Sequence, residues 1–246
     1  MWNRLKKLFS NKSAETATEQ SGRPPCAPPL EPAVPAEPTP PVLAFDNARP
    51  EVEAFLELDI SSAKADSEKG EKAKSVMKKM AIDIDQIERA ARGNPENAID
   101  TGLWLSGSGY GNLAQELTNR FRESGWLDHE QFASALWARS TLAVNATFHH
   151  LVGPAMLANA DCQQRLGNTD RATYIYTSVF KDFVFLIATW QQNPSAPDGD
   201  DKAAIECLRT AIEKLTALGN SEVEGTDLKT SGEHVLQILE RSGSGE

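Results

Sequence analysis

Apolar residues in this chain recur at steps of three and four, and almost never alternate with polar ones. Val76, Met80, Ile84 and Ile87 set out one face of a helix. Glycine, asparagine and proline separate further stretches of this kind, which predict helices over about 112–123, 128–152, 154–166, 169–192, 203–218 and 233–239. Because the connections between them are short, we expect an all-α fold. Its antiparallel helical hairpins would be stacked as a short solenoid or bundle.

A proline-rich stretch separates this helical part from the start of the chain. Ten of the fourteen prolines lie between Pro24 and Pro50. Such a segment favours extended polyproline II and buries too little apolar surface to offset its ordering entropy. We therefore expect a disordered linker over 13–50, between a basic tip (1–12) and a helical domain (51–241) with a frayed tail (242–246). The alternative function for the linker is a docking site for a proline-reading domain.

The basic tip predicts contact with a membrane surface. Residues 1–12 hold four basic residues and no acid, although the whole chain carries a net charge of −10. On a helix the apolar residues of this segment fall within one arc and most of its cations outside it, which is typical of a helix lying in the membrane interface. The expected contact residues are Trp2, Arg4, Leu5, Lys6, Lys7, Leu8 and Phe9. The alternative is a frayed start with a few chance apolar residues.

The rest of the composition limits the function. The acidic balance disfavours nucleic acid as a partner. Three cysteines with no CxxC pair predict neither a disulfide framework nor a zinc site, and we expect Cys162 and Cys207 to be buried thiols. No apolar run has the length of a membrane span or of a secretory signal. These features predict a cytoplasmic protein, peripheral at the membrane at most, with no cofactor, metal or catalytic residue.

A glycine turn followed by an alanine five residues later occurs twice. Gly167 precedes Ala172 in this way, and Gly109 precedes Ala114, 58 residues earlier. Small residues also stand twelve positions before each alanine. The pattern resembles tetratricopeptide repeats, in which a glycine closes the first helix and the alanine packs against it. The matching positions are Gly102, Gly109, Ala114, Ala160, Gly167, Ala172, Tyr176 and Val179.

The resemblance implies a solenoid of helical hairpins with a concave face that binds protein. It covers about 60 residues in two pieces, and the chain departs from the family in several places. Adjacent repeats of the family are 34 residues apart. Met156, Asn159 and Gln163 stand where the family prefers Trp, Leu and Tyr, and Phe121 is bulky at a small site. The alternative is that any antiparallel hairpin needs a glycine turn and small contact residues.

These patterns predict a non-catalytic scaffold or adaptor for protein–protein interaction, whose partner the sequence does not identify. One alternative is an enzyme with a site between helices, near the turn Gly107–Gly111 and His149. That turn lacks the Lys-Ser/Thr of a phosphate loop, and the neighbouring side chains of His149 and His150 would point about 100° apart on a helix. A third hypothesis is a secreted effector whose disordered head serves as an export signal.

Overall fold

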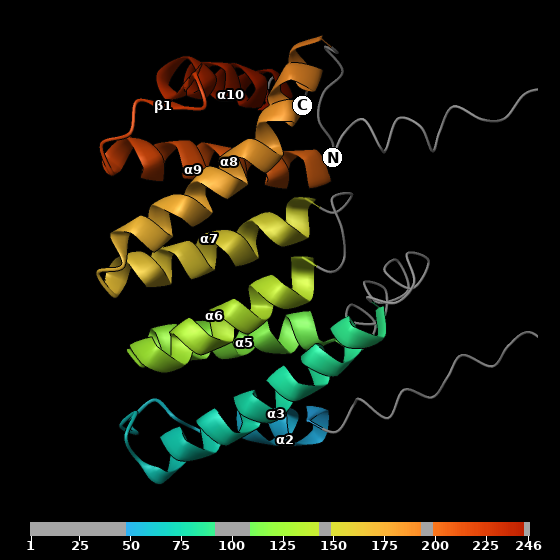
Figure 1. The fold of residues 1–246 in the computed structure, drawn as a ribbon, viewed down its shortest axis with the longest axis vertical. Helices are drawn as coiled ribbons and strands as arrows, with labels where there is room; N and C mark the ends of the chain where they lie inside the picture. The colour runs from blue at the N-terminus through green and yellow to red at the C-terminus, as the bar shows by residue number, and fades with distance from the viewer. Residues whose placement is uncertain (1–47, 92–108, 143–148, 193–198, 244–246) are drawn as a thin grey trace, which may run out of the picture. The chain divides into compact units, whose positions relative to one another are not determined.

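The structure, a computed structural model, describes residues 48–91, 109–142, 149–192 and 199–243. All of them belong to one compact unit, Leu43–Glu246. The basic tip, nearly all of the predicted linker, Gly102 and Gly107 lie outside the described residues. Figure 1 shows how the described segments follow one another.

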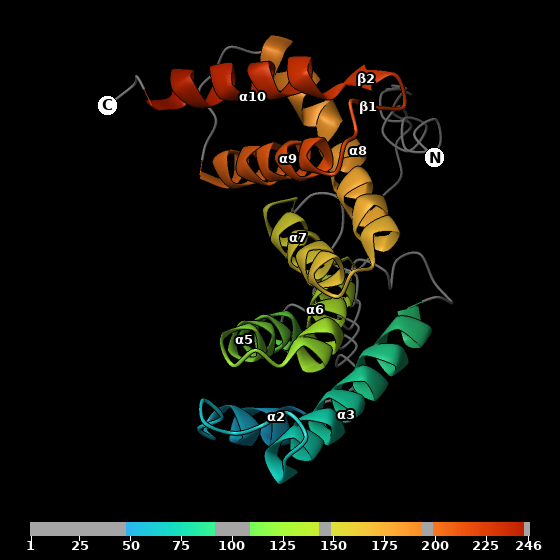
Figure 2. The same cartoon turned by 90° about the vertical axis from the view of Figure 1, so that its left-hand side faces the viewer.

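The described part of the chain is almost entirely helical, which confirms the predicted all-α fold. Consecutive helices from α5 to α9 pack against each other; α2 packs against α3 and α5, and α3 against α6. Figures 1 and 2 show the resulting stack of α5 to α10. The helices are α2 (Arg49–Leu56), α3 (Glu68–Ala91), α5 (Tyr110–Glu123), α6 (Leu127–Leu142), α7 (His149–Arg165), α8 (Thr169–Gln192), α9 (Gly199–Ala217) and α10 (Leu228–Gly243).

One small antiparallel ladder departs from the expectation of helices alone. Strands β1 (Glu222–Val223) and β2 (Thr226–Asp227) pair between α9 and α10. The two residues at the turn, Glu224 and Gly225, have φ of 49° and 77°. Positive φ at both central positions is the geometry of a tight type I′ hairpin turn. Two-residue strands are too short to show an alternating pattern in the sequence, so the prediction missed them.

Several helix boundaries differ from the predicted ones, and α9, for example, begins at Gly199, four residues before its predicted start. Helix α6 was predicted to start at about residue 128, but it begins at Leu127, and the carbonyl of Trp126 accepts the amide of Glu130 at 2.9 Å. The last helix starts five residues before its predicted start, where Asp227 caps it by accepting the amide of Thr230 at 2.7 Å. Pro50, assigned to the linker, lies in the first turn of α2, where a missing amide hydrogen does little harm.

Gly153 and Pro154 do not break the helix as predicted, because α7 begins before them. A proline this near a helix start removes few hydrogen bonds, and close packing holds the segment in place. A Cβ added to Gly153 would lie 2.7 Å from Cys207 Sγ and 3.0 Å from Phe183 Cζ. Gly153 therefore marks a close approach of α7 to α8 and α9.

Three helices end in the same hydrogen-bonded turn. Gly125, Gly167 and Gly219 have φ of 69°, 79° and 85°, and they follow α5, α7 and α9. In each turn the glycine amide bonds the carbonyl three residues back, and the next amide bonds the carbonyl five residues back. This is the Schellman motif, which satisfies carbonyls left without partners at a helix end. The chain reverses after each, and Figure 1 shows the three turns on the same side.

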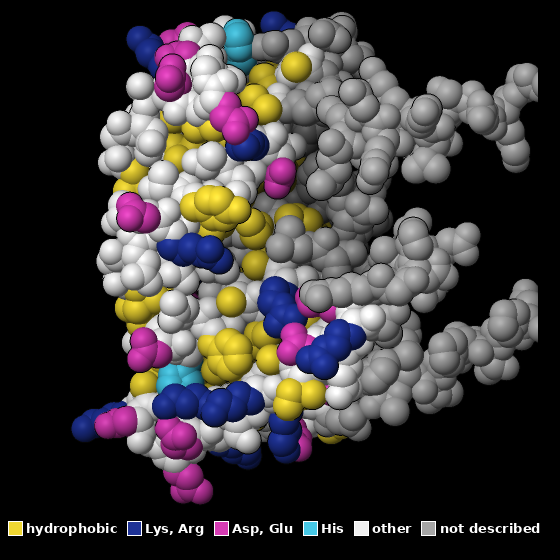
Figure 3. All heavy atoms as spheres, in the orientation of Figure 1, with side chains coloured by type: hydrophobic (Ala, Val, Ile, Leu, Met, Phe, Trp, Pro, Cys, Tyr) yellow, Lys and Arg dark blue, Asp and Glu magenta, His cyan; other side chains and the backbone are white. Residues whose placement is uncertain are grey.

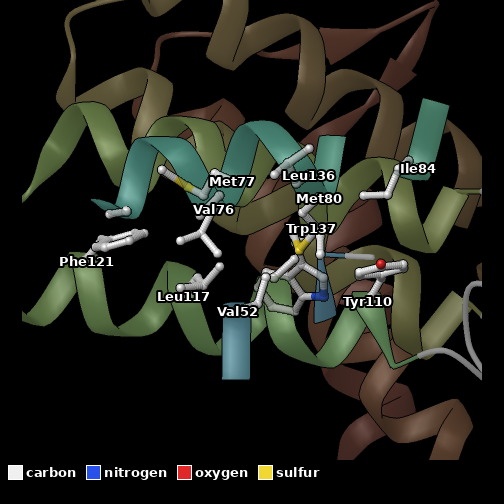
Figure 4. Close-up of a cluster of buried hydrophobic side chains, with 14 of the residues drawn as sticks. Val52, Val76, Met77, Met80, Ile84, Tyr110, Leu117, Phe121, Leu136 and Trp137 are labelled. Carbon is white, nitrogen blue, oxygen red and sulfur yellow. The ribbon is translucent and has the colours of Figure 1, made fainter. Parts of the chain in front are cut away.

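Two apolar clusters form the core. The first joins α2, α3, α5 and α6, together with Ala155 and Ala158 of α7. Figure 4 shows part of it, with side chains from these four helices pointing toward one another. The second joins α8, α9 and α10 to Leu157 and Ala160 of α7. Met156 packs against both clusters, so α7 is the helix that they share.

The close approach at Gly153 predicts a matched pair of glycine substitutions. Gly153→Ala should lower the free energy of unfolding by about 1–3 kcal/mol, because its methyl group would overlap Cys207 and Phe183. Gly111→Ala, also in a helix, should be neutral or raise stability by up to about 1 kcal/mol, because the nearest atoms to its Cβ are 4.0 Å away. Urea unfolding of both variants checks this. Equal midpoints would contradict the close contact.

Candidate interaction surfaces

The predicted packing residues of the α7–α8 hairpin lie together inside it. Ala160 on α7 and Ala172, Tyr176 and Val179 on α8 belong to one buried cluster, and none is more than 1% exposed. Gly167 forms the turn between the two helices. Small residues allow two helices to approach closely, and the tyrosine fills the space that they leave. This stretch has the packing that the sequence pattern predicted; membership of the tetratricopeptide family remains a prediction.

The second predicted hairpin is described only in its second half. Ala114 is fully buried in α5, and Gly109 precedes that helix with φ of 73°. The residues of the expected first helix, including Gly102, lie outside the described segments. Within the described segments, the helix-ending turns equivalent to Gly167 are those at Gly125 and Gly219, which lie 42 residues before it and 52 residues after it. These spacings are unequal and longer than the 34-residue period.

A polar network links α7, α8 and α9 near one end of the α7–α8 hairpin. The hydroxyl of Tyr176 donates a hydrogen bond to Asp161, and Lys214 Nζ lies 2.8 Å from Asp161 Oδ1. Burial of the Tyr176 ring, with the nearby Asp161 carboxylate, raises the pKa of the phenol far above its ordinary value. Tyr176 therefore stays protonated and acts as a fixed hydrogen-bond donor.

A buried carboxylate joins α5, α6 and α7. The side chain of Glu130 has no exposed surface, and its Oε1 atom accepts from Arg122 Nε at 2.9 Å and from Arg165 Nη2. The two arginine side chains are 41% and 43% exposed, so they bring charge from the surface to a buried partner. Burying a carboxylate is costly unless such partners compensate it. The cluster fixes how α5, α6 and α7 meet.

Sequence reasoning missed two buried acids, Glu130 and Asp83. Asp83 is 3% exposed and accepts the Ala48 amide at 2.9 Å and the Tyr110 hydroxyl at 2.5 Å. Its position was a usable signal, because it lies four residues before Ile87 on the apolar face of α3. Glu130 gave no comparable signal, because an acid in the first turn of a helix is common on the surface.

The outer face of α8 carries the most exposed large apolar side chain in the described part of the chain. Tyr174 is 64% exposed, and the Arg171 guanidinium lies 5.7 Å from its ring centre. Lys181, two turns further on, is also exposed and pairs with Glu224 at 2.5 Å. We call Arg171, Tyr174, Ser178 and Lys181 the α8 ridge. It lies opposite the buried stripe of the helix, and tyrosine and arginine are enriched in binding hot spots.

Charge on α2 and α3 is mixed in sign. Figure 3 shows Lys and Arg side chains gathered over this region with acidic ones among them. Lys79 pairs with Glu51, and Lys74 pairs with Glu71 at 2.7 Å. Exposed pairs of this kind contribute little to stability, and they leave no uniform basic patch for an anionic partner.

The region of the alternative enzyme site is described only in part. Tyr110 is fully buried and its hydroxyl is bonded to Asp83, while a Cβ at Gly111 would meet Ser140 and Thr141 of α6. His149 begins α7, but its side chain lies outside what the structure describes. The described residues hold no group of three His, Cys, Asp or Glu placed to bind a metal.

The two described cysteines are buried free thiols, as predicted. Burial raises the pKa of both Cys162 and Cys207 to about 11. They therefore carry little thiolate near neutral pH. Among the helices that the structure describes, none is both long and apolar enough to cross a membrane.

The comparisons with known proteins found no match. No protein-family model matches the chain, and neither the curated proteins nor the solved structures contain a significant match.

The hairpin packing predicts that position 172 does not accept a larger side chain. Ala172→Leu should cost about 1–3 kcal/mol of unfolding free energy, because it overfills the contact between α7 and α8. Ala188→Leu is the matched control, because Ala188 lies on the same helix and is exposed; it should change stability by less than about 0.5 kcal/mol. Denaturant midpoints measure both. A wild-type midpoint for Ala172→Leu would contradict the packing.

The Glu130 cluster predicts non-additive effects. Removing either arginine leaves the other to compensate Glu130, whereas Arg122→Ala/Arg165→Ala leaves a buried unpaired carboxylate, which costs about 3–5 kcal/mol. The loss in the double variant should therefore exceed the sum of the single losses. In a Glu130→Leu background the same double change should cost much less. Urea unfolding of the full set tests this, and simple additivity in both backgrounds would refute it.

Proposed function

We propose that this protein is a non-catalytic scaffold that binds another protein through its helical stack, with the α8 ridge as the contact surface. The observation that carries the proposal is the Tyr174–Arg171 pair. A large aromatic ring stands 64% exposed on a helix, with a guanidinium 5.7 Å from its centre. A ring already ordered by a neighbour loses little conformational freedom when a partner covers it.

Contacts between α8 and its neighbours support the proposal, because they would hold this surface in a fixed position. The polar network around Asp161 ties α8 to α7 and α9. The pair Lys181–Glu224 ties the ridge to the β1–β2 turn. Binding sites on firmly held helices keep their geometry better than sites on loops. The stack is expected to bind as a preformed surface, without folding on contact.

The N-terminal tip supplies the second part of the proposal, and its support comes from the sequence alone. Trp2, Leu5, Leu8 and Phe9 would enter a membrane interface while Arg4, Lys6 and Lys7 face anionic lipid. The proline-rich segment would act as a semi-extended tether between this contact and the helical stack. The protein would then hold its partner near a membrane surface in the cytoplasm.

The proposed contact surface predicts a localised loss of binding. A photo-crosslinking residue at position 178, one turn along the ridge from Tyr174, should capture a partner protein in the cells that produce the full chain. Tyr174→Ala should weaken affinity for the captured protein by about tenfold or more, as expected of a hot-spot residue. Lys202→Ala, which removes an exposed side chain on α9, should leave affinity unchanged. Equal affinities for both variants would refute the α8 ridge as the binding surface.

The tether predicts weak, salt-dependent binding to lipid. The full chain should co-sediment with anionic vesicles at low salt, because each cation near the surface contributes about 1 kcal/mol. A chain lacking residues 1–12 and the variant Trp2→Ala/Phe9→Ala should partition less. Neutral vesicles are the lipid control. If all three proteins sediment alike, the tip does not bind the membrane.

A further inference from the structure

A cavity of about 290 Å³ lies beside α10, the last helix that the structure describes. Figure 2 shows α10 at the end of the stack, away from α2 and α3. The described residues that line the cavity are His234, Gln237, Ile238 and Arg241. Their spacing places them on one flank of the helix, within an arc of about 100° at 100° per residue. None of them belongs to the α8 ridge, so the cavity is a site distinct from the proposed protein-binding surface.

The cavity has an apolar side and a polar side. Ile238 is buried and belongs to the apolar cluster that α10 shares with α8 and α9. Gln237 and Arg241 are exposed, and His234 is half-buried. All three polar side chains carry N–H donors, and the imidazole ring keeps at least one in its neutral form and in its charged form. A ligand in this cavity would therefore meet an apolar wall and several hydrogen-bond donors together.

The charge beside the cavity is opposite in sign to that of the chain. The chain carries a net charge of −10, but the described residues that line the cavity include an arginine and no acid. Arg139, Arg165 and Arg209 each pair with an acid. Arg241 forms no ion pair within the described residues, and the side chains of His234 and Gln237 have no hydrogen-bond partner there. Their donors are therefore available to a ligand.

We propose that this cavity binds a small organic carboxylate. The guanidinium of Arg241 matches the two oxygens of a carboxylate and can pair with both. Gln237 and His234 supply further donors, and a short apolar chain would lie against Ile238. The volume is close to the lower limit of small-molecule sites, roughly 300 Å³, which suits a short-chain acid. The same carboxylate chemistry is found in free acids and at the C-terminus of a peptide, and the experiment separates these two sources.

Titration of the full chain with hexanoate, followed by NMR of the histidine rings, tests the proposal. The His234 resonance is assigned by its loss in His234→Gln. In the wild type it should shift and saturate with hexanoate, whereas uncharged hexanamide should bind about tenfold more weakly or worse. Arg241→Gln should weaken hexanoate binding by about tenfold or more, because it removes the charged donor. Lys229→Gln removes a cation from another flank of the same helix and should leave the affinity unchanged.

A short peptide with a free C-terminus, compared with the same peptide amidated, identifies the source of the carboxylate. Tighter binding of the free-acid peptide than of hexanoate assigns the cavity to peptide C-termini, and weaker binding assigns it to small acids. Equal binding of hexanoate and hexanamide would overturn the proposal, as would equal effects of Arg241→Gln and Lys229→Gln. An equal response to inorganic phosphate would overturn it too, because the cavity would then accept any anion. A His234 resonance that none of these compounds shifts would rule out the site.

Discussion

The fold depends on the packing of α6 against α7. Within the described residues the two apolar clusters meet here: Ala155 and Ala158 complete the first, Leu157 and Ala160 enter the second, and Met156 packs against both. Two polar contacts hold the same junction, Arg165 with Glu130 and Cys162 Sγ with the Leu127 carbonyl at 3.8 Å. If this contact were lost, each cluster would keep its own helices and the stack would separate into two parts. A surface such as the α8 ridge owes its fixed position relative to α5 and α6 to this junction.

The spacing of apolar residues and the glycines at helix ends were sufficient to predict the helical fold. Gly125, Gly167 and Gly219 each ended a predicted helix, because the left-handed geometry of the Schellman turn favours glycine. The same rules misplaced the start of α7, because Gly153 serves a close contact with Cys207 and Phe183 that no local pattern records. The sequence predicted helix starts less accurately than helix ends. At the start of α6, for example, the Trp126 carbonyl accepts the first helical hydrogen bond, and a tryptophan has no side-chain acceptor that would mark a cap in the sequence.

The candidate surfaces were harder to predict than the fold. The positions Ala160, Ala172, Tyr176 and Val179 were expected to pack together because of the resemblance to tetratricopeptide repeats, and all four are buried. The burial of Glu130 and Asp83 was not predicted, because their partners come from helices distant in sequence, and only the tertiary structure brings Arg165 to Glu130 or Ala48 to Asp83. The α8 ridge was missed for a different reason. A tyrosine on a helix indicates a binding surface only when it is known to be exposed, and this requires knowing which face of the helix is buried. The tetratricopeptide resemblance suggested a concave binding face, whereas our proposal rests on an outer face.

Native-state hydrogen exchange of the full chain, in increasing urea, tests most directly whether α6 and α7 hold the stack together. The account predicts that the amides of α6 and α7 share the highest opening free energy, while α2 and α10 open at lower free energies. It also predicts that Gly153→Ala lowers the protection of α7 and α9 more than that of α3. If α6 and α7 instead opened at different free energies, each with its own apolar cluster, the two clusters would be independent and the α6–α7 junction would not be the contact on which the fold depends.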